Sequence, residues 1–282
     1  MMGTMKLGNL DGRAVLVSDV GAIDVAHASA GEFGPSLRSV YDRWDDFTAA
    51  ALAFDAVPSP FVPEQLGPPS PDPRQVFAIG LNYRAHAEET GQDVPDVPAT
   101  FTKFPSCLNV PFGEIALPAD TVDWEVELVV VIGRDASDVA ATDAWDHVAG
   151  LTVGQDISER TTQMAAGRQF SLGKSYAGFG PTGPWVVTVD EVADPDDLAL
   201  GCSLDGETVQ DARTSDLIFP VPELIARLSA IVTLRPGDLI FTGTPSGVGV
   251  ARTPPRFLAP GQVLETWVEG IGRLRHHITK GS

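Results

Sequence analysis

Two glutamates one residue apart are the first side chains in this sequence that could share a metal ion. They lie in residues 123–132 (DWEVELVVVI), where apolar and β-branched residues predict a strand over 125–132. Because side chains alternate along a strand, Glu125 and Glu127 share one face, with Cα atoms roughly 6.6 Å apart. Both carboxylates could then reach one hard cation. The alternative is an exposed edge strand, whose glutamates need no ligand.

Asp156 could supply a third carboxylate, because it lies at the end of a strand-like run at residues 151–153. Together with Glu125 and Glu127, Asp156 would form an oxygen-only site of the kind that Mg²⁺ or Mn²⁺ prefers, with water or substrate in the open positions. Arg160, one helical turn onward, could hold a substrate carboxylate through two hydrogen bonds. The alternative for Asp156 is to cap a helix that follows it.

A histidine and a glutamate three residues apart are candidates for proton transfer. They follow a predicted strand at residues 76–80, and loops at strand ends often carry function. In a helix, Glu89 would lie on the same face as His86, where its carboxylate could orient the imidazole or share a water with it. The alternative is an ion pair on the surface of the helix.

Lys174 and a glycine-rich segment complete the candidates. Gly173-Lys174-Ser175 is not a phosphate loop, because that motif needs a glycine where this sequence has Arg168. A lone loop lysine is commonly solvated, which is the alternative for Lys174. Residues 237–249 predict a turn, an apolar strand and a loop with three glycines. In that loop the backbone could approach a ligand closely and Thr244 could donate a hydrogen bond, unless the loop is an ordinary tight turn.

The elements that must position these residues are separated by a proline-rich segment. Seven prolines among residues 58–73 predict an extended linker. Residues 1–57 predict a small N-terminal domain that packs without chemistry of its own, with apolar residues at helical spacing from Leu37 to Phe47. Residues 74–282 predict one β-rich α+β domain, with a helix from Pro222 to Ile231 and strands at 76–80, 125–132, 183–189, 198–204 and 239–242.

Composition narrows the class of partner. Lys and Arg number 19 against 38 Asp and Glu, and the resulting formal charge of −19 would repel nucleic acid. An acidic small-molecule substrate would need local positive charge from a metal or from a few basic side chains. Cys107 and Cys202 have no metal-type spacing, and no run is apolar enough to span a membrane. We therefore expect a cytoplasmic protein without nucleic-acid or membrane partners.

Together and in this order, five segments resemble the fumarylacetoacetate hydrolase family. The likeness spans about residues 74 to 278, and its most specific motif is the last segment. The segments are Gly80-Leu81-Asn82-Tyr83 with His86 and Glu89, the pair Glu125-x-Glu127, residues 156–163, Gly173-Lys174-Ser175 with residues 180–185, and residues 242–249 (TGTPSGVG).

The resemblance implies a fold, a cofactor and a set of roles. The fold would be a mixed β-sandwich or barrel roll with a small N-terminal domain, assembled as a homodimer. Glu125, Glu127 and Asp156 would bind Mg²⁺ or Mn²⁺, with Ca²⁺ as a further candidate. The remaining roles are catalysis by His86, Glu89 and Lys174, and substrate binding by Tyr83, Arg160, Gln163, Gly243 and Thr244.

The implied activity is hydrolysis of a carbon–carbon bond in a small 2,4-dioxo acid, an acylpyruvate or a fumarylacetoacetate-like compound of aromatic catabolism. His86 and Glu89 would activate the water, the metal would stabilise the enolate, and Lys174 would stabilise the oxyanion. We expect burial and the metal to lower the pKa of Lys174. Departures from the family pattern at Gln155 and residues 159–162 leave the identity of the substrate open. The alternatives are oxaloacetate decarboxylation, hydration or isomerisation of a 2-oxo acid, and a non-catalytic binding protein stabilised by metal.

Overall fold

The computed structural model describes residues 5–165, 167 and 169–281. Within them the largest element is an 11-stranded mixed sheet. Its strands are β1 (Lys6–Leu10), β2 (Arg13–Ser18), β3 (Gly21–Asp24), β4 (Leu66–Gly67), β5 (Val76–Gly80), β6 (Ala99–Thr102), β7 (Leu108–Asn109), β10 (Val126–Ile132), β11 (Val148–Gln155), β13 (Gly180–Val187) and β16 (Leu239–Phe241). They run in the order β3-β2-β1-β13-β11-β10-β16-β5-β6, with β4 beside β1 and β7 beside β13.

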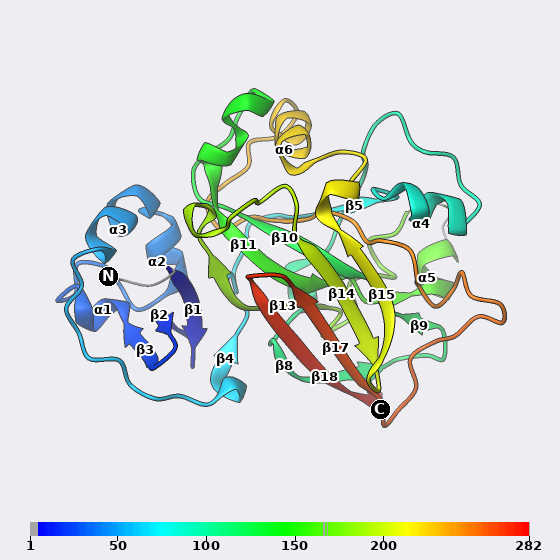
Figure 1. Cartoon of the computed structure of the whole chain (residues 1–282), viewed down its shortest axis with the longest axis horizontal. Coiled ribbons are helices and arrows are strands. Elements are labelled where there is room, and N and C mark those ends of the chain that lie inside the picture. Colours follow the sequence, from blue (N-terminus) through cyan, green and yellow to red (C-terminus); the bar gives the residue numbers. More distant parts are fainter. Residues whose placement is uncertain (1–4, 166, 168, 282) are drawn as a thin grey trace.

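A second, five-stranded sheet packs on the first (Figure 1). It comprises β8 (Phe112–Leu117), β14 (Ala199–Leu204), β15 (Glu207–Arg213), β17 (Val263–Val268) and β18 (Gly272–Lys280), in the order β15-β14-β17-β18-β8. A short ribbon pairs β9 (Val122–Asp123) with β12 (Ser158–Glu159). The main apolar core lies between the two sheets, as the β-rich pattern of the sequence predicts.

The central strand β10 is buried on both faces. Its even-numbered residues from Val126 to Ile132 belong to the core between the sheets. Val129 and Val131 point the other way and pack with apolar residues of the N-terminal segment, including Trp44 and Phe47. This double burial explains the unbroken apolar run in the sequence. The edge-strand alternative is wrong, because β10 lies between β11 and β16.

The N-terminal segment is joined to the main sheet through backbone pairing. Strand β1 pairs with β13, and β4, within the proline-rich segment, pairs with β1. The helices here are α1 (Val25–Ala28), α2 (Leu37–Tyr41) and α3 (Trp44–Ala51). The residues at helical spacing from Leu37 to Phe47 are all buried, but they belong to two helices, because the chain turns at Asp42 and Arg43. The division into two domains and a linker stays a prediction.

The remaining helices are α4 (Arg84–Glu89), α5 (Arg160–Ala165) and α6 (Val221–Ser229). Figure 1 places α4 and α5 at the end of the long axis opposite the N-terminal elements. Short 3-10 turns occur at η1 (Pro63–Gln65), η2 (Pro105–Cys107), η3 (Ala141–His147), η4 (Val189–Glu191) and η5 (Thr214–Asp216). The helix predicted from Pro222 to Ile231 is α6, which begins one residue earlier and ends two residues sooner.

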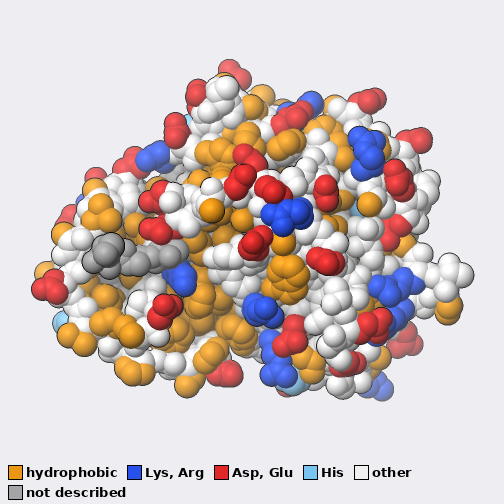
Figure 2. All heavy atoms as spheres, viewed as in Figure 1, with side chains coloured by type: hydrophobic (Ala, Val, Ile, Leu, Met, Phe, Trp, Pro, Cys, Tyr) orange, Lys and Arg blue, Asp and Glu red, His pale blue; other side chains and the backbone are white. Residues whose placement is uncertain are grey.

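Surface and burial fit the compositional expectations. Figure 2 shows acidic side chains spread over the whole of one face, in keeping with the net charge of −19. Both cysteines are buried and free. In the described ranges, no helix combines the length and the apolar character needed to cross a bilayer.

Candidate metal centre and active site

Three buried carboxylates, those of Glu125, Glu127 and Asp156, converge at one end of β10 and β11. One oxygen from each lies within 4.8 Å of the other two. The antiparallel register explains the meeting, because Val126 lies opposite Gln155 and the Asp156 amide donates to the Glu125 carbonyl at 2.9 Å. The metal-ligand geometry expected from the alternation along β10 is therefore present.

Two lysines neutralise part of this cluster. The ammonium of Lys174 donates to Glu125 Oε2 at 2.7 Å and to Asp156 Oδ2 at 2.5 Å. The fully buried ammonium of Lys103 donates to Asp156 Oδ1 at 2.6 Å, to the Phe179 carbonyl at 3.2 Å and to the Lys174 carbonyl. Lys174 is thus a buried residue of the site, and the solvated alternative is wrong.

Glu127 is the member of the triad that lacks a cation. Its carboxylate accepts a hydrogen bond from the Gly243 amide at 2.8 Å, and no ion pair to it occurs among the described residues. Burial, together with Asp156 and Glu125, raises the pKa of Glu127 well above its usual range. Burial also acts on Glu125, but Lys174 and Arg160 outweigh it and lower the pKa of Glu125 to about 2.

These contacts show that the residues fit a divalent cation. Counting Asp123, Glu125, Glu127 and Asp156 against Lys103, Lys174 and Arg160, the cluster holds one more carboxylate than cations. An ion between the carboxylates would remove the repulsion that acts on Glu127, and all three offer the hard oxygen ligands of Mg²⁺ or Mn²⁺. The Tyr83 hydroxyl is buried and has no hydrogen-bond partner among the described residues, and burial and Glu127 raise its pKa.

We expected a lowered pKa for Lys174, but the neighbouring groups of the protein raise it. Burial favours the neutral amine and lowers this pKa, but Asp156 and Glu125 together outweigh burial and raise it. Lys174 therefore carries a positive charge that ties two of the candidate metal ligands together.

Arg160 is engaged by a carboxylate that the sequence analysis did not select. Its Nε and Nη2 donate to Asp123 Oδ2 at 2.9 and 2.7 Å, and its Nη1 donates to Glu125 at 2.7 Å and to Gln163 at 3.0 Å. The edge of the guanidinium that could grip a substrate carboxylate is occupied by Asp123. The proposed substrate-binding roles of Arg160 and Gln163 stay predictions, and the structure shows the pair holding Glu125.

The capping alternative for Asp156 is wrong. The amides of Thr161 and Thr162, in the first turn of α5, donate to the carboxylate of Glu159 at 3.1 and 2.7 Å. Both oxygens of Asp156 point instead to Lys103 and Lys174.

The candidate proton-transfer pair forms as the i, i+3 spacing predicts. In α4, Nδ1 of His86 lies 2.7 Å from Glu89 Oε1, and Glu89 Oε2 accepts a hydrogen bond from the Gly247 amide at 2.8 Å. His86 is only 8% exposed, so the surface-pair alternative is wrong. Within the described residues Nε2 of His86 makes no hydrogen bond, which leaves it open to a substrate or a water.

A cavity of about 730 Å³ collects these groups. Its walls include residues from both the acidic cluster and the histidine–glutamate pair: His86, Glu89, Glu125, Arg160, Gln163, Lys174 and Thr244. Tyr83, Glu127, Asp156 and Gly243 lie outside its lining. Each of the five segments therefore contributes at least one selected residue to this one space, while the individual roles remain predictions.

The glycine-rich segment after β16 works as a positioning element. Gly243 has φ +104°, and a Cβ there would lie 2.7 Å from Cβ of Asn82, so glycine is required. Its amide holds Glu127, and the next hydroxyl, that of Thr244, accepts from Gln210 Nε2 at 2.8 Å. The Gly243 amide thus contacts a candidate metal ligand, and the substrate-binding roles expected of Gly243 and Thr244 stay predictions.

Sequence analysis missed Lys103, Asp123 and Arg252, the last a cavity-lining residue. Asp123 carried a usable signal, because it alternates with Glu125 and Glu127 and lies on their face of the chain. Lys103 and Arg252 carried none, because basic residues in loops are ordinarily exposed.

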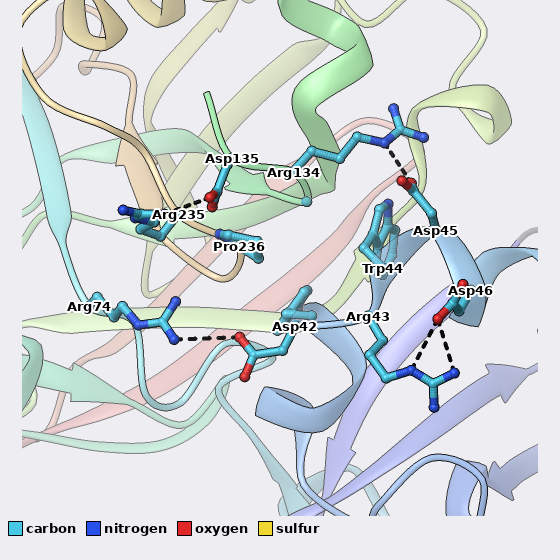
Figure 3. A pocket seen from close by; sticks show the side chains of 12 residues that line it. Asp42, Arg43, Trp44, Asp45, Asp46, Arg74, Arg134, Asp135, Arg235 and Pro236 are labelled. Carbon is cyan, nitrogen blue, oxygen red and sulfur yellow. Dashed lines mark hydrogen bonds and ion pairs between the residues drawn. The ribbon is translucent and has the colours of Figure 1, made fainter. Parts of the chain in front are cut away.

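A second hollow of about 600 Å³ lies between the N-terminal segment and the main body (Figure 3). Each of its arginines is already paired with an aspartate, and Figure 3 shows these pairs facing one another. The pairs are Arg43–Asp46 at 3.0 Å, Arg74–Asp42 at 3.6 Å, Arg134–Asp45 at 2.5 Å and Arg235–Asp135 at 2.5 Å. This hollow offers no unpaired charge to a ligand and holds none of the candidate site residues.

Comparison with known proteins gives the same picture. The family model described as fumarylacetoacetate (FAA) hydrolase C-terminal matches residues 75–279. The human protein named oxaloacetate tautomerase FAHD2A, mitochondrial, is 46% identical over 203 residues, covering 71% of this chain and 65% of the human protein. The match thus spans less than two thirds of that relative's length.

Solved structures match over nearly the whole chain. A crystal structure from Mycobacterium smegmatis is 53% identical with a TM-score of 0.96, covering 99% of this chain and 100% of the other. Maleylpyruvate hydrolase from Sphingobium sp. SYK-6, in complex with manganese(II) and pyruvate, is 29% identical with a TM-score of 0.79, again covering 99% and 100%.

Fold and site together define a class of β-rich proteins in which a buried carboxylate triad lies beside a histidine–glutamate pair. Because the family model covers most of the chain and relatives in it are close in sequence, this chain belongs to the fumarylacetoacetate hydrolase family. The resemblance and the fold class expected from the sequence are confirmed. The human and Sphingobium relatives are named as enzymes, a tautomerase and a hydrolase.

Proposed function

We propose that this protein is a divalent-metal-dependent enzyme that interconverts the enol and keto forms of a small 2-oxo acid of the oxaloacetate type. The observation that carries the proposal is the position of His86, whose Nε2 is open to the same cavity that Glu125 and Lys174 line. The 46% identity to a human oxaloacetate tautomerase supports it.

The residues of the chain would divide the work as follows. A bound Mg²⁺ or Mn²⁺ would supply Lewis-acid polarisation of the 2-oxo and carboxylate oxygens. His86 would take the enol hydroxyl proton at Nε2, and the resulting imidazolium would return a proton to C3, so that one proton leaves oxygen and one reaches carbon. Glu89 stabilises the imidazolium, because its Oε1 lies 2.7 Å from Nδ1. The positive charge of Lys174 would stabilise the enolate between the two steps.

Hydrolysis of a carbon–carbon bond in a 2,4-dioxo acid is the second candidate. The same histidine–glutamate pair could deprotonate a water for attack on the distal carbonyl, and the cavity of about 730 Å³ has room for both water and substrate. The likeness to maleylpyruvate hydrolase supports this reaction. Both candidates need the same residues, and they differ in whether a water is consumed.

A turnover screen tests the proposal. Metal-free protein would be given Mg²⁺ or Mn²⁺ and assayed with enol-oxaloacetate for tautomerisation, with acetylpyruvate for hydrolysis and with oxaloacetate for decarboxylation. We expect metal-dependent tautomerisation that EDTA abolishes. Tautomerisation that persists in EDTA would sink the proposal, and absence of any turnover with either metal would favour a non-catalytic binding protein.

Replacing His86 separates the reactions. His86→Ala should abolish tautomerisation and hydrolysis, which need a proton carrier, whereas decarboxylation needs no activated water and should survive better. We further propose a homodimer in the cytoplasm that uses Mg²⁺ or Mn²⁺. Sedimentation, cell fractionation and metal analysis of the native protein check these three points.

A further inference from the structure

Most basic groups at the cavity are already neutralised by acidic partners. Lys174 bridges Glu125 and Asp156, and Arg160 is bound by Asp123 and Glu125. Arg252 also lines the cavity, but none of its hydrogen bonds to the described residues goes to a carboxylate. Among the lysines and arginines that line the cavity, it is the one without a carboxylate partner in the described part of the chain.

Arg252 is held in place by neutral groups. Its Nη2 donates to the carbonyls of Val209 and Gly247 at 3.0 and 3.2 Å, and its guanidinium carbon lies 5.6 Å from the centre of the Trp124 ring. Its Nε is buried and has no hydrogen-bond partner within the described part of the chain. A guanidinium held this way has a fixed orientation and unused donors, which are the properties of an anion-binding group.

Gly247 links Arg252 to the proton-transfer pair His86 and Glu89. Gly247 donates its amide to Glu89 at 2.8 Å and accepts Nη2 of Arg252 on its carbonyl. One residue therefore positions both the carboxylate that orients His86 and the unpaired arginine. A substrate held at the acidic cluster and at His86 would share the cavity with Arg252, which lines it together with His86 and Glu125.

We propose that Arg252 binds the distal carboxylate of a dicarboxylic 2-oxo acid, and so selects dicarboxylates over monocarboxylates of the same chain length. The inference rests on the proposed function for the orientation of the substrate. It adds the residue that recognises the second carboxylate, and it gives the acidic protein a local positive charge at that position.

Paired ligands test this selection by binding, independently of turnover. Oxaloacetate would be compared with 2-oxobutanoate, and 2-oxoglutarate with 2-oxopentanoate, because each pair differs only by a terminal carboxylate in place of a methyl group. Dissociation constants would be measured by calorimetric titration of Mg²⁺-loaded protein. The proteins are wild type, Arg252→Met, Arg252→Lys and Arg256→Met, the last removing an arginine of the same segment that pairs with Glu207 outside the cavity.

The expected result is specific to the dicarboxylates. In at least one pair, wild type and Arg256→Met should bind the dicarboxylate about tenfold or more tighter than the monocarboxylate. Arg252→Met should lose that preference while its affinity for the monocarboxylate stays within about twofold, and Arg252→Lys should fall between.

Two outcomes would overturn the proposal. One is a wild-type protein with no preference for the dicarboxylate in either pair, which decides the matter even if the variants fail to fold. The other is an equal loss for both members of a pair in Arg252→Met, which would mean that Arg252 only supports Gly247 or the charge of Glu89. Because these are binding measurements, they remain informative if the turnover screen finds no reaction.

Discussion

Lys103 and Asp156 form an ion pair at 2.6 Å in which both side chains are almost completely buried. A buried charge is costly without its partner. The pair therefore holds the Asp156 carboxylate in place, because moving it away from Lys103 would leave both charges buried and unpaired. Lys103 also donates to the carbonyl of Lys174. One lysine thus positions a candidate metal ligand and the backbone of the second lysine.

Removing that lysine should be strongly destabilising. Lys103→Met leaves Asp156 buried beside other carboxylates, and we expect the free energy of unfolding in urea to fall by about 3–5 kcal/mol. Arg213→Met, which breaks an exposed pair to Asp197, should change the free energy of unfolding far less, because water screens exposed charges. Equal losses for the two variants would show that Lys103 is not the counterion of the cluster.

Glu127→Gln should be more stable than wild type without metal and less stable than wild type with metal bound. Without metal, Glu127→Gln removes the repelled carboxylate but can keep an acceptor for the Gly243 amide, so its melting temperature should exceed that of wild type. With Mg²⁺ at about 100 times its dissociation constant, wild type should gain about 2.7 kcal/mol and overtake the variant. Parallel melting curves with and without metal would contradict a metal site at Glu127.

Removing the carboxylate of Glu89 should lower the reaction rate and leave metal binding unchanged. Glu89→Gln loses the charge that stabilises protonated His86, and we expect kcat for enol-oxaloacetate to fall about 10²-fold or more. Glu88→Gln, on the exposed side of the same helix, is the matched control and should retain wild-type kcat. The stabilisation by Mg²⁺ should be the same in all three proteins, and its loss in Glu89→Gln would point to a metal-ligand role instead.

A buried histidine should make stability depend on pH. His276 donates from Nε2 to the Val110 carbonyl at 2.9 Å, and its buried Nδ1 has no hydrogen-bond partner in the part of the chain that the structure describes. Burial lowers the pKa of His276 from 6.5 to about 4. The unfolded chain therefore binds one more proton than the folded chain between pH 6.5 and about 4. Stability from this group is complete above pH 6.5 and is lost as the pH falls through that window, by about 3 kcal/mol in total.

Urea unfolding at several pH values checks the histidine. His276→Gln should lose less stability than wild type between pH 7 and pH 4, whereas His277→Gln, an exposed neighbour on β18, should follow wild type. An unchanged pH profile for His276→Gln would mean that the imidazole is not kept neutral by burial.

Local periodicity explains how much of the site could be predicted. Alternation along one strand places Glu125 and Glu127 together, and helical spacing places Glu89 beside His86, because both relationships depend only on backbone geometry over a few residues. The same alternation would have included Asp123. Asp156, Lys174 and the glycine-rich segment were selected because motifs in a fixed order resemble a known family.

The sequence by itself determined the family and the β-rich fold, and it predicted Glu125, Glu127, Asp156 and His86 as site residues. Only the tertiary structure decided how charge is distributed at the site: that Arg160 is held by Asp123, that Lys103 reaches Asp156 across 53 residues, and that Arg252 has no acidic partner within the described ranges. The physical reason is that an ion pair depends on which distant segments the fold brings within a few ångströms, and spacing along the chain does not contain that information.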